Sequence, residues 1–230
     1  MLILSNTKTI EERHFYLKLA VKENYSVREL NRQLQSLYYQ RYILSDGNVS
    51  KGITEIINEG DTFPNTRLLD TYSLEFLDLP NEFSENDLKK SIINNLKSFI
   101  LEVGNDFTFI GDEYRIQVGK HDFYIDLLFY NRELSCLVAF ELKLGEFKAE
   151  YLGKMNLYLK ALDRDVRKEN ENPSVGIILC SSKDKDVVEY SMSKNMSQTM
   201  ISEYKLKLID KKLLENKLKE VKKIIDNNKK

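Results

Sequence analysis

The chain has 230 residues, which is enough for one substantial domain and an appendage. Its 35 lysine and arginine residues are balanced by 36 aspartate and glutamate residues, giving a formal net charge of −1. The overall charge therefore does not indicate a nucleic-acid-binding protein, and any basic surface must be local. No apolar run is long enough to span a membrane, and the apolar start at Met1–Leu4 is too short for the core of a signal peptide.

The two cysteines, Cys136 and Cys180, lie in apolar segments and have no partner at metal-ligand spacing. We therefore expect buried, reduced thiols in a cytoplasmic protein. Neither histidine has catalytic surroundings, because His14 lies in a helical pattern and His121 beside a turn.

The first 47 residues predict a helical segment. Residues 11–24 have a helical pattern, and a second helix is expected to begin after Ser26, with Glu29 as its capping-box partner. This helix is expected to continue past Arg41 and to end before Asp46. Residues 48–80 have weak periodicity and several glycine and proline residues, with one short helix expected over 53–58. We interpret 48–80 as a connector that lies against the next domain.

The next domain is expected over 81–210 and starts with the clearest helix. Ser84 and Asp87 form a capping-box pattern, an apolar stripe runs from Leu88 to Val103, and Gly104 suits the end of the helix. Glu102 lies at the edge of this stripe. Strands are then expected over 107–118 (one bent strand or a pair), 123–130, 134–144, 174–180 and 201–208, and helices over 148–162 and 184–194. The run 174–180 is apolar throughout, which indicates a buried strand parallel to 138–144, whereas 201–208 is expected at an edge.

Three charged residues interrupt the two most apolar strands: Asp126, Glu141 and Lys143. A charge within an apolar strand costs several kcal/mol of desolvation unless it is paired or binds a metal. Because strand side chains alternate, Glu141 and Lys143 share one face and Asp126 can meet them across a hairpin. Two carboxylates can hold a hard divalent cation, and a lysine can stabilise developing negative charge. A buried ion pair between Lys143 and one acid is the alternative, although it leaves the second acid unexplained.

The sequence around these residues resembles the YhcG-type PD-(D/E)XK nuclease family of bacterial proteins. The resemblance covers about 82–206 and rests on four motifs: Asp-Leu-Leu-Phe-Tyr, Val-Ala-Phe-Glu-Leu-Lys, Glu-Tyr-Leu-Gly-Lys-Met-Asn-Leu-Tyr-Leu and Glu-Asn-Pro-Ser-Val-Gly-Ile-Ile-Leu-Cys. It implies a restriction-endonuclease-like α/β sandwich with a central mixed sheet, preceded here by the N-terminal helices. It also implies a Mg²⁺-dependent DNA endonuclease, in which Mn²⁺ is expected to substitute.

The resemblance implies a role for each residue of the site. Asp126, Glu141 and the main-chain carbonyl of Leu142 would hold the metal, and Lys143 would orient the attacking water and offset charge on the phosphate. Nucleases of the superfamily often supply another acid from the first helix, for which Glu102 is the candidate; a solvated acid in the last turn is the equal alternative.

Several alternatives remain open from the sequence. Lys154 could contact a phosphate or pair with Glu150, and Arg115 is a further candidate for nucleic-acid contact. The N-terminal segment resembles the end of a winged-helix DNA-binding domain, but a helical hairpin that packs on the nuclease is favoured. The lysine-rich segment 211–230 predicts a docking helix rather than a DNA-binding arm.

The expected partner is DNA, with no membrane association, and the resemblance is compatible with a homodimer without indicating one. Two other functions remain: a non-catalytic nucleic-acid- or protein-binding module on a nuclease fold, and an RNA nuclease, because the same metal site would cleave either backbone.

Overall fold

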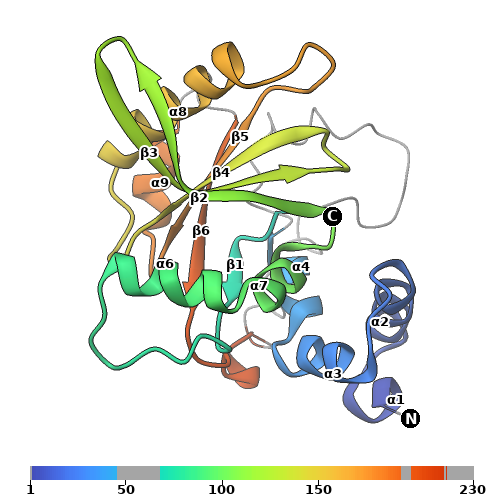
Figure 1. Ribbon diagram of the computed structural model, residues 1–230. Helices are drawn as coiled ribbons and strands as arrows, with labels where there is room; N and C mark the ends of the chain where they lie inside the picture. Colours follow the sequence, from blue (N-terminus) through green and yellow to red (C-terminus); the bar gives the residue numbers. More distant parts are fainter. Residues whose placement is uncertain (1, 46–67, 193–197, 215, 217–230) are drawn as a thin grey trace, which may run out of the picture.

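A six-stranded mixed sheet forms the centre of the molecule, with helices on both faces (Figure 1). The computed structural model describes residues 2–45, 68–192, 198–214 and 216. The strands are β1 (Thr71–Ser73), β2 (Phe107–Val118), β3 (His121–Asn131), β4 (Cys136–Leu142), β5 (Val175–Cys180) and β6 (Thr199–Lys205). This arrangement confirms the expected α/β class with a mixed sheet.

The order of strands is β1-β6-β5-β4-β3-β2. β2, β3 and β4 are antiparallel, whereas β4, β5, β6 and β1 are parallel to one another. The parallel pairing of β5 with β4 was predicted. The expected edge position of β6 is wrong, because β1 pairs with its outer side and places Thr71 opposite Glu203.

β1 comes from the segment that the sequence suggested was a connector. Leu69, Tyr72 and Leu74 are almost completely buried in the core between the sheet and the first helices of the domain. The sheet therefore includes a strand that lies before the expected boundary at residue 81. The helix expected over 53–58 and most of the C-terminal helix expected over 211–230 lie outside the described residues.

β2 is a single bent strand, one of the two arrangements expected for 107–118. Its pairing with β3 shifts register between Phe109 and Gly111, which is typical of a β-bulge. Gly119 turns the chain into β3 with φ +62°, a conformation that glycine adopts without strain. The resulting hairpin extends beyond the rest of the sheet (Figure 1).

The helices are α1 (Leu2–Asn6), α2 (Ile10–Lys22), α3 (Val27–Gln35), α4 (Tyr38–Ser45), α6 (Glu85–Asn94), α7 (Leu96–Val103), α8 (Glu150–Asp165) and α9 (Lys185–Ser191). Both predicted capping boxes are present, at Ser26 and at Ser84. Two helices expected to be continuous are each divided. Leu37, with φ +57°, separates α3 from α4, and Asn95 separates α6 from α7. No helix in the described ranges is long and apolar enough to cross a membrane.

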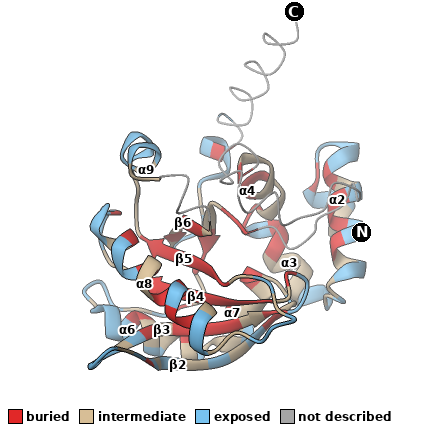
Figure 2. Ribbon diagram, turned by 90° about the horizontal axis from the view of Figure 1, so that it is seen from above, coloured by how far each residue is buried: buried red, intermediate tan, exposed pale blue. Residues whose placement is uncertain are grey.

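The two faces of the sheet carry separate hydrophobic cores. α6 and α7 cover one face through side chains such as Leu88 and Phe99, and α8 covers the other through Leu152 and Met155. β4 and β5 are buried along their whole length between these layers (Figure 2). Gly176 on β5 allows α8 to approach closely, because a Cβ atom there would lie 2.5 Å from the Met155 sulfur. α8 therefore packs closely against β5, and its Lys154 reaches Glu141 of β4.

Candidate active site

Asp126 and Glu141 come together where β3 and β4 cease to pair. Leu127 lies opposite Phe140 in the antiparallel register, so the next position along the two strands holds Asp126 and Glu141. Here the Asp126 side chain accepts the Leu142 N–H at 2.8 Å through Oδ2. Neighbouring side chains of the same face, Leu128 and Ala139, pack in the core under α8. Both carboxylates therefore lie on the α8 side of the sheet.

The main-chain carbonyl of Leu142 is directed to the same side of β4 as Asp126. The Lys143 N–H donates to the Leu179 carbonyl of β5 at 2.9 Å. The Leu142 carbonyl belongs to the same peptide unit and points in the opposite direction, so it is directed toward β3. The Leu142 N–H follows this rule by donating to Asp126.

Glu141 is a buried carboxylate with unequal oxygens. Its side chain is 1% exposed, and Oε1 lies 2.6 Å from the Lys154 ammonium and 3.0 Å from that of Lys143. Oε2 is buried and has no hydrogen-bond partner among the described residues. A buried oxygen without a partner normally costs 1–3 kcal/mol or more, because it has lost its hydration. Oε2 of Glu141 is thus not used by a protein donor in the described part of the chain.

Lys143 is placed between two acids. Its ammonium group lies 3.0 Å from Glu141 and 3.0 Å from Glu85, which is in the first turn of α6. It also lies 5.5 Å from the centre of the Tyr151 ring. Burial, the largest single influence, lowers the pKa of Lys143, but the carboxylates of Glu141 and Glu85 together outweigh it and raise the pKa above its ordinary value. Lys143 is therefore protonated at neutral pH.

The surroundings of Asp126 disfavour its charged form, whereas those of Lys143 favour the charged form of the lysine. Burial, and then the negative charge of Glu141, raise its pKa above the ordinary value, although the hydrogen bond from Leu142 opposes the shift. A divalent cation between the two acids would remove this repulsion.

The donor set fits a hard divalent cation. Two carboxylates and a main-chain carbonyl provide oxygen ligands, and Mg²⁺ is typically bound through one or two carboxylates with water completing its octahedron. Within the described ranges, no group of three or more histidine, cysteine, aspartate or glutamate side chains forms a larger metal cluster. Asp126 and Glu141, with the Leu142 carbonyl, are therefore the residues that could hold such an ion.

The same region matches a known family. The model of the YhcG PDDEXK nuclease domain matches residues 65–219. The chain belongs to this family. The match begins before β1, in agreement with the place of that strand in the sheet.

YhcG of Escherichia coli (strain K12), itself classed as a nuclease by inference, is 35% identical over 215 residues. These residues cover 94% of the chain but only 57% of that relative, so the chain spans little more than half of its length. Among solved structures, a repair endonuclease from Pyrococcus abyssi is 19% identical and covers 57% of the chain and 50% of its own, with a TM-score of 0.36. In the EndoMS–dsDNA complex the protein is 16% identical to this chain. The match covers 58% of this chain and 48% of that one, with a TM-score of 0.39.

Glu102 is not part of this site in the YhcG-family fold. Its buried carboxylate accepts hydrogen bonds from Arg41 at 2.5 Å, from Arg32 at 3.1 Å and from the Ser73 N–H at 2.7 Å. These partners belong to α4, α3 and β1, so Glu102 joins the N-terminal helices to the sheet. The structure therefore does not bring Glu102 together with Asp126 and Glu141, because its oxygens are already bound by these groups.

The acid that α6–α7 brings to the site is Glu85, which the sequence did not single out. Glu85 is one of several acids near the start of α6 and is about half exposed, at 48%. Only the position of α6 over the end of β4 distinguishes it from Asp87, which caps the helix. The capping box at Ser84 fixes where the first turn begins, but it does not mark which acid of that turn reaches Lys143.

The two candidates for nucleic-acid contact have different surroundings. Lys154 pairs with Glu141, not with Glu150 as one alternative supposed. Arg115 lies on the projecting hairpin, is 55% exposed, and pairs with Asp122 at 2.9 Å. Lys154 thus belongs to the candidate active site, whereas Arg115 lies on the hairpin.

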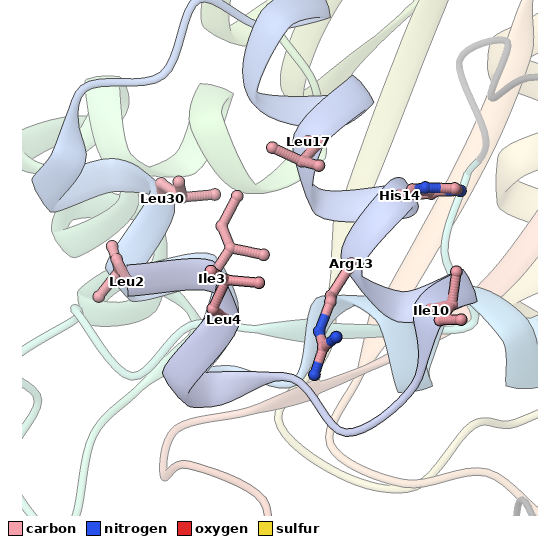
Figure 3. A pocket seen from close by; sticks show the side chains of 8 residues that line it. All are labelled: Leu2, Ile3, Leu4, Ile10, Arg13, His14, Leu17 and Leu30. Carbon is pink, nitrogen blue, oxygen red and sulfur yellow. The ribbon is translucent and has the colours of Figure 1, made fainter.

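A separate pocket of about 550 Å³ lies on the N-terminal helices (Figure 3). Its lining is mainly apolar and comes from α1, α2 and α3: Leu2, Ile3, Leu4, Ile10, Leu17 and Leu30, with Arg13 and His14. None of these described lining side chains is a carboxylate, so they do not provide the oxygen ligands that a metal-dependent reaction on phosphates requires.

Proposed function

We propose that this chain is a metal-dependent endonuclease that hydrolyses phosphodiester bonds of DNA, with Mg²⁺ as its ion. The observation that supports this most strongly is the carboxylate of Glu141. One of its oxygens is buried and has no partner among the residues that the structure describes, and the carboxylate lies beside a second acid and a protonated lysine. Membership of the YhcG PDDEXK nuclease domain family supports a nuclease, and the contacts of Glu141 with Lys143 and Lys154 support a role for this cluster.

Asp126 and Glu141 would bind the ion, with the Leu142 carbonyl directed to the same side of β4. When bound, Mg²⁺ would polarise the scissile phosphate and lower the pKa of a coordinated water. Lys143 lies next to Glu141 and would donate to the attacking water or to a phosphate oxygen as negative charge develops. Glu85 would restrict where the Lys143 ammonium can lie, because the two groups are in contact.

The preference for DNA comes from the family and not from the site. An ion held by two carboxylates would hydrolyse RNA by the same chemistry, and the net charge of −1 favours neither nucleic acid.

The test is incubation of the purified protein with duplex, branched and single-stranded DNA and with RNA, in Mg²⁺, Mn²⁺ or EDTA. We expect cleavage of DNA within the strand in either metal and none in EDTA. If only RNA is cleaved, the proposed substrate changes from DNA to RNA. Binding of DNA without cleavage under every metal condition would contradict the enzymatic proposal.

A further inference from the structure

The charges at the candidate active site are largely compensated in the absence of metal. Asp126, Glu141 and Glu85 carry up to three negative charges, and the ammonium groups of Lys143 and Lys154 offset two of them. Both ammonium groups lie on Glu141 Oε1, at 3.0 Å and 2.6 Å. Glu85 is more exposed and already pairs with Lys143.

A compensated pair of carboxylates attracts a cation less strongly than a free pair, because site affinity rises with the net charge of the ligands. If an ion enters while both lysines remain, the same groups carry an excess of positive charge. That excess attracts an anion, and a phosphodiester that bridges the ion and the lysines would restore the balance.

Lys154 is built into this position by its helix. Its ammonium group lies 5.4 Å from the centre of the Tyr158 ring, and the Tyr158 hydroxyl donates to the Tyr124 carbonyl at 2.6 Å. The Lys154 side chain is 44% exposed, whereas Glu141 is 1% exposed. Lys154 therefore lies between the buried carboxylate and the solvent from which a substrate would arrive.

We propose that Lys154 makes metal binding depend on the nucleic acid: it neutralises Glu141 in the free protein, so that the metal and an anionic phosphodiester bind cooperatively. This inference rests on the proposed function. Lys154 acts here as a positioning residue that works through Glu141. By linkage, the factor by which DNA tightens metal binding equals the factor by which the metal tightens DNA binding.

The test compares Lys154→Gln with the matched control Lys160→Gln, which removes the same charge from an exposed position on α8. Each protein is titrated calorimetrically with Ca²⁺, a cation that prefers oxygen ligands, with and without a saturating short DNA duplex. Gels of the same samples show whether the duplex stays intact. Melting temperatures with and without Ca²⁺ provide a second measurement.

Without DNA, we expect Lys154→Gln to bind Ca²⁺ at least about tenfold more tightly than the parent, because one neighbouring charge changes the affinity of a carboxylate for a cation by this order. Without metal, Lys154→Gln should melt at a lower temperature than the parent. Ca²⁺ should raise its melting temperature by more than it raises that of the parent. For Lys154→Gln, the Ca²⁺ dissociation constant without DNA divided by that with DNA should be smaller than the same ratio for the parent. Lys160→Gln should behave like the parent.

Equal or weaker Ca²⁺ binding by Lys154→Gln, or an unchanged ratio, would overturn the inference while leaving the metal site intact. A lower melting temperature alone would also overturn it, because a merely structural ion pair predicts that result. Absence of metal binding in every protein, with or without DNA, would instead contradict the proposed function itself.

Discussion

At the scale of single residues, the site depends on what surrounds Glu141. Two lysines share one of its oxygens, and the other oxygen is buried without a partner in the described part of the chain. Strand alternation was sufficient to place Asp126, Glu141 and Lys143 together, because each interrupts an apolar strand at a position facing the same side. Alternation could not predict the contact of Lys154, since that depends on how closely α8 approaches the sheet.

Asp126→Asn tests the electrostatic account directly. A carboxyl group with a raised pKa stabilises the fold at low pH, and this contribution is lost as the pH rises through its pKa in the folded state. At neutral pH and without metal, we therefore expect the variant to have a free energy of unfolding at least equal to that of the parent. The difference should shrink as the pH is lowered. The asparagine oxygen can still accept the Leu142 N–H.

Mn²⁺ should raise the melting temperature of the parent and not that of Asp126→Asn. Urea unfolding across a pH series and thermal melts with Mn²⁺ make the two measurements. An equal metal-induced rise in both proteins would exclude Asp126 as a ligand.

At the scale of elements, the least predictable features are those set by tertiary contacts. Leucine favours helices, yet Leu37 takes a positive φ and is 6% exposed, so packing overrides its local preference. β1 has only three residues, too few to show a periodic pattern. In contrast, both capping boxes and the β2–β3 turn were predicted, because local sequence alone decides them.

Glu102 at the end of α7 links four elements through one buried carboxylate. Arg41 is 2% exposed and Glu102 is fully buried. Removing one partner of such a pair leaves an uncompensated buried charge and typically costs about 3–5 kcal/mol. We expect Glu102→Ala to lower the free energy of unfolding by about this amount, measured by urea denaturation.

Glu189→Ala is the matched control, because Glu189 is an exposed acid in α9. It should change the free energy of unfolding by less than about 0.5 kcal/mol, as expected for a surface substitution. Similar stabilities for the two variants would show that the buried ion pair makes no net contribution.

At the scale of the whole molecule, the structure revises the boundary that the sequence suggested. A chain beginning at Asn81 would lack β1 and the buried side chains Leu69, Tyr72 and Leu74. A chain beginning at residue 65, where the family match starts, keeps β1 but loses Arg32 and Arg41, the two arginine partners of Glu102.

We expect the chain that begins at residue 65 to fold with reduced stability, and Glu102→Gln to recover part of the loss by removing the unpaired charge. The chain that begins at Asn81 should fail to unfold cooperatively. Thermal melts of the full chain, of the chain from residue 65 with and without Glu102→Gln, and of the chain from Asn81 make the comparison. Cooperative melting of the shortest chain at the temperature of the full chain would show that β1 and the N-terminal helices are not part of the folding unit.

The fold class and the acid–acid–lysine set were accessible from sequence because they depend on strand patterns. The link between the N-terminal helices and the sheet was not, because Arg41 and Glu102 are 61 residues apart and each has an ordinary helical neighbourhood. Glu85 was missed for the same reason: nothing local marks which acid of a helix will meet Lys143.

The most direct test of the account is single-turnover cleavage of duplex DNA in Mg²⁺ by the parent and by Lys143→Ala, with DNA affinity measured on the same preparations. Lys143 belongs to neither hydrophobic core, and Lys154 stays paired with Glu141 when Lys143 is removed, so the variant should fold and bind DNA much like the parent. Its cleavage rate should fall by about 10²–10³-fold, the usual cost of removing one donor from developing charge. Cleavage by Lys143→Ala at the rate of the parent would make Lys143 a structural ion-pair partner and would contradict the account.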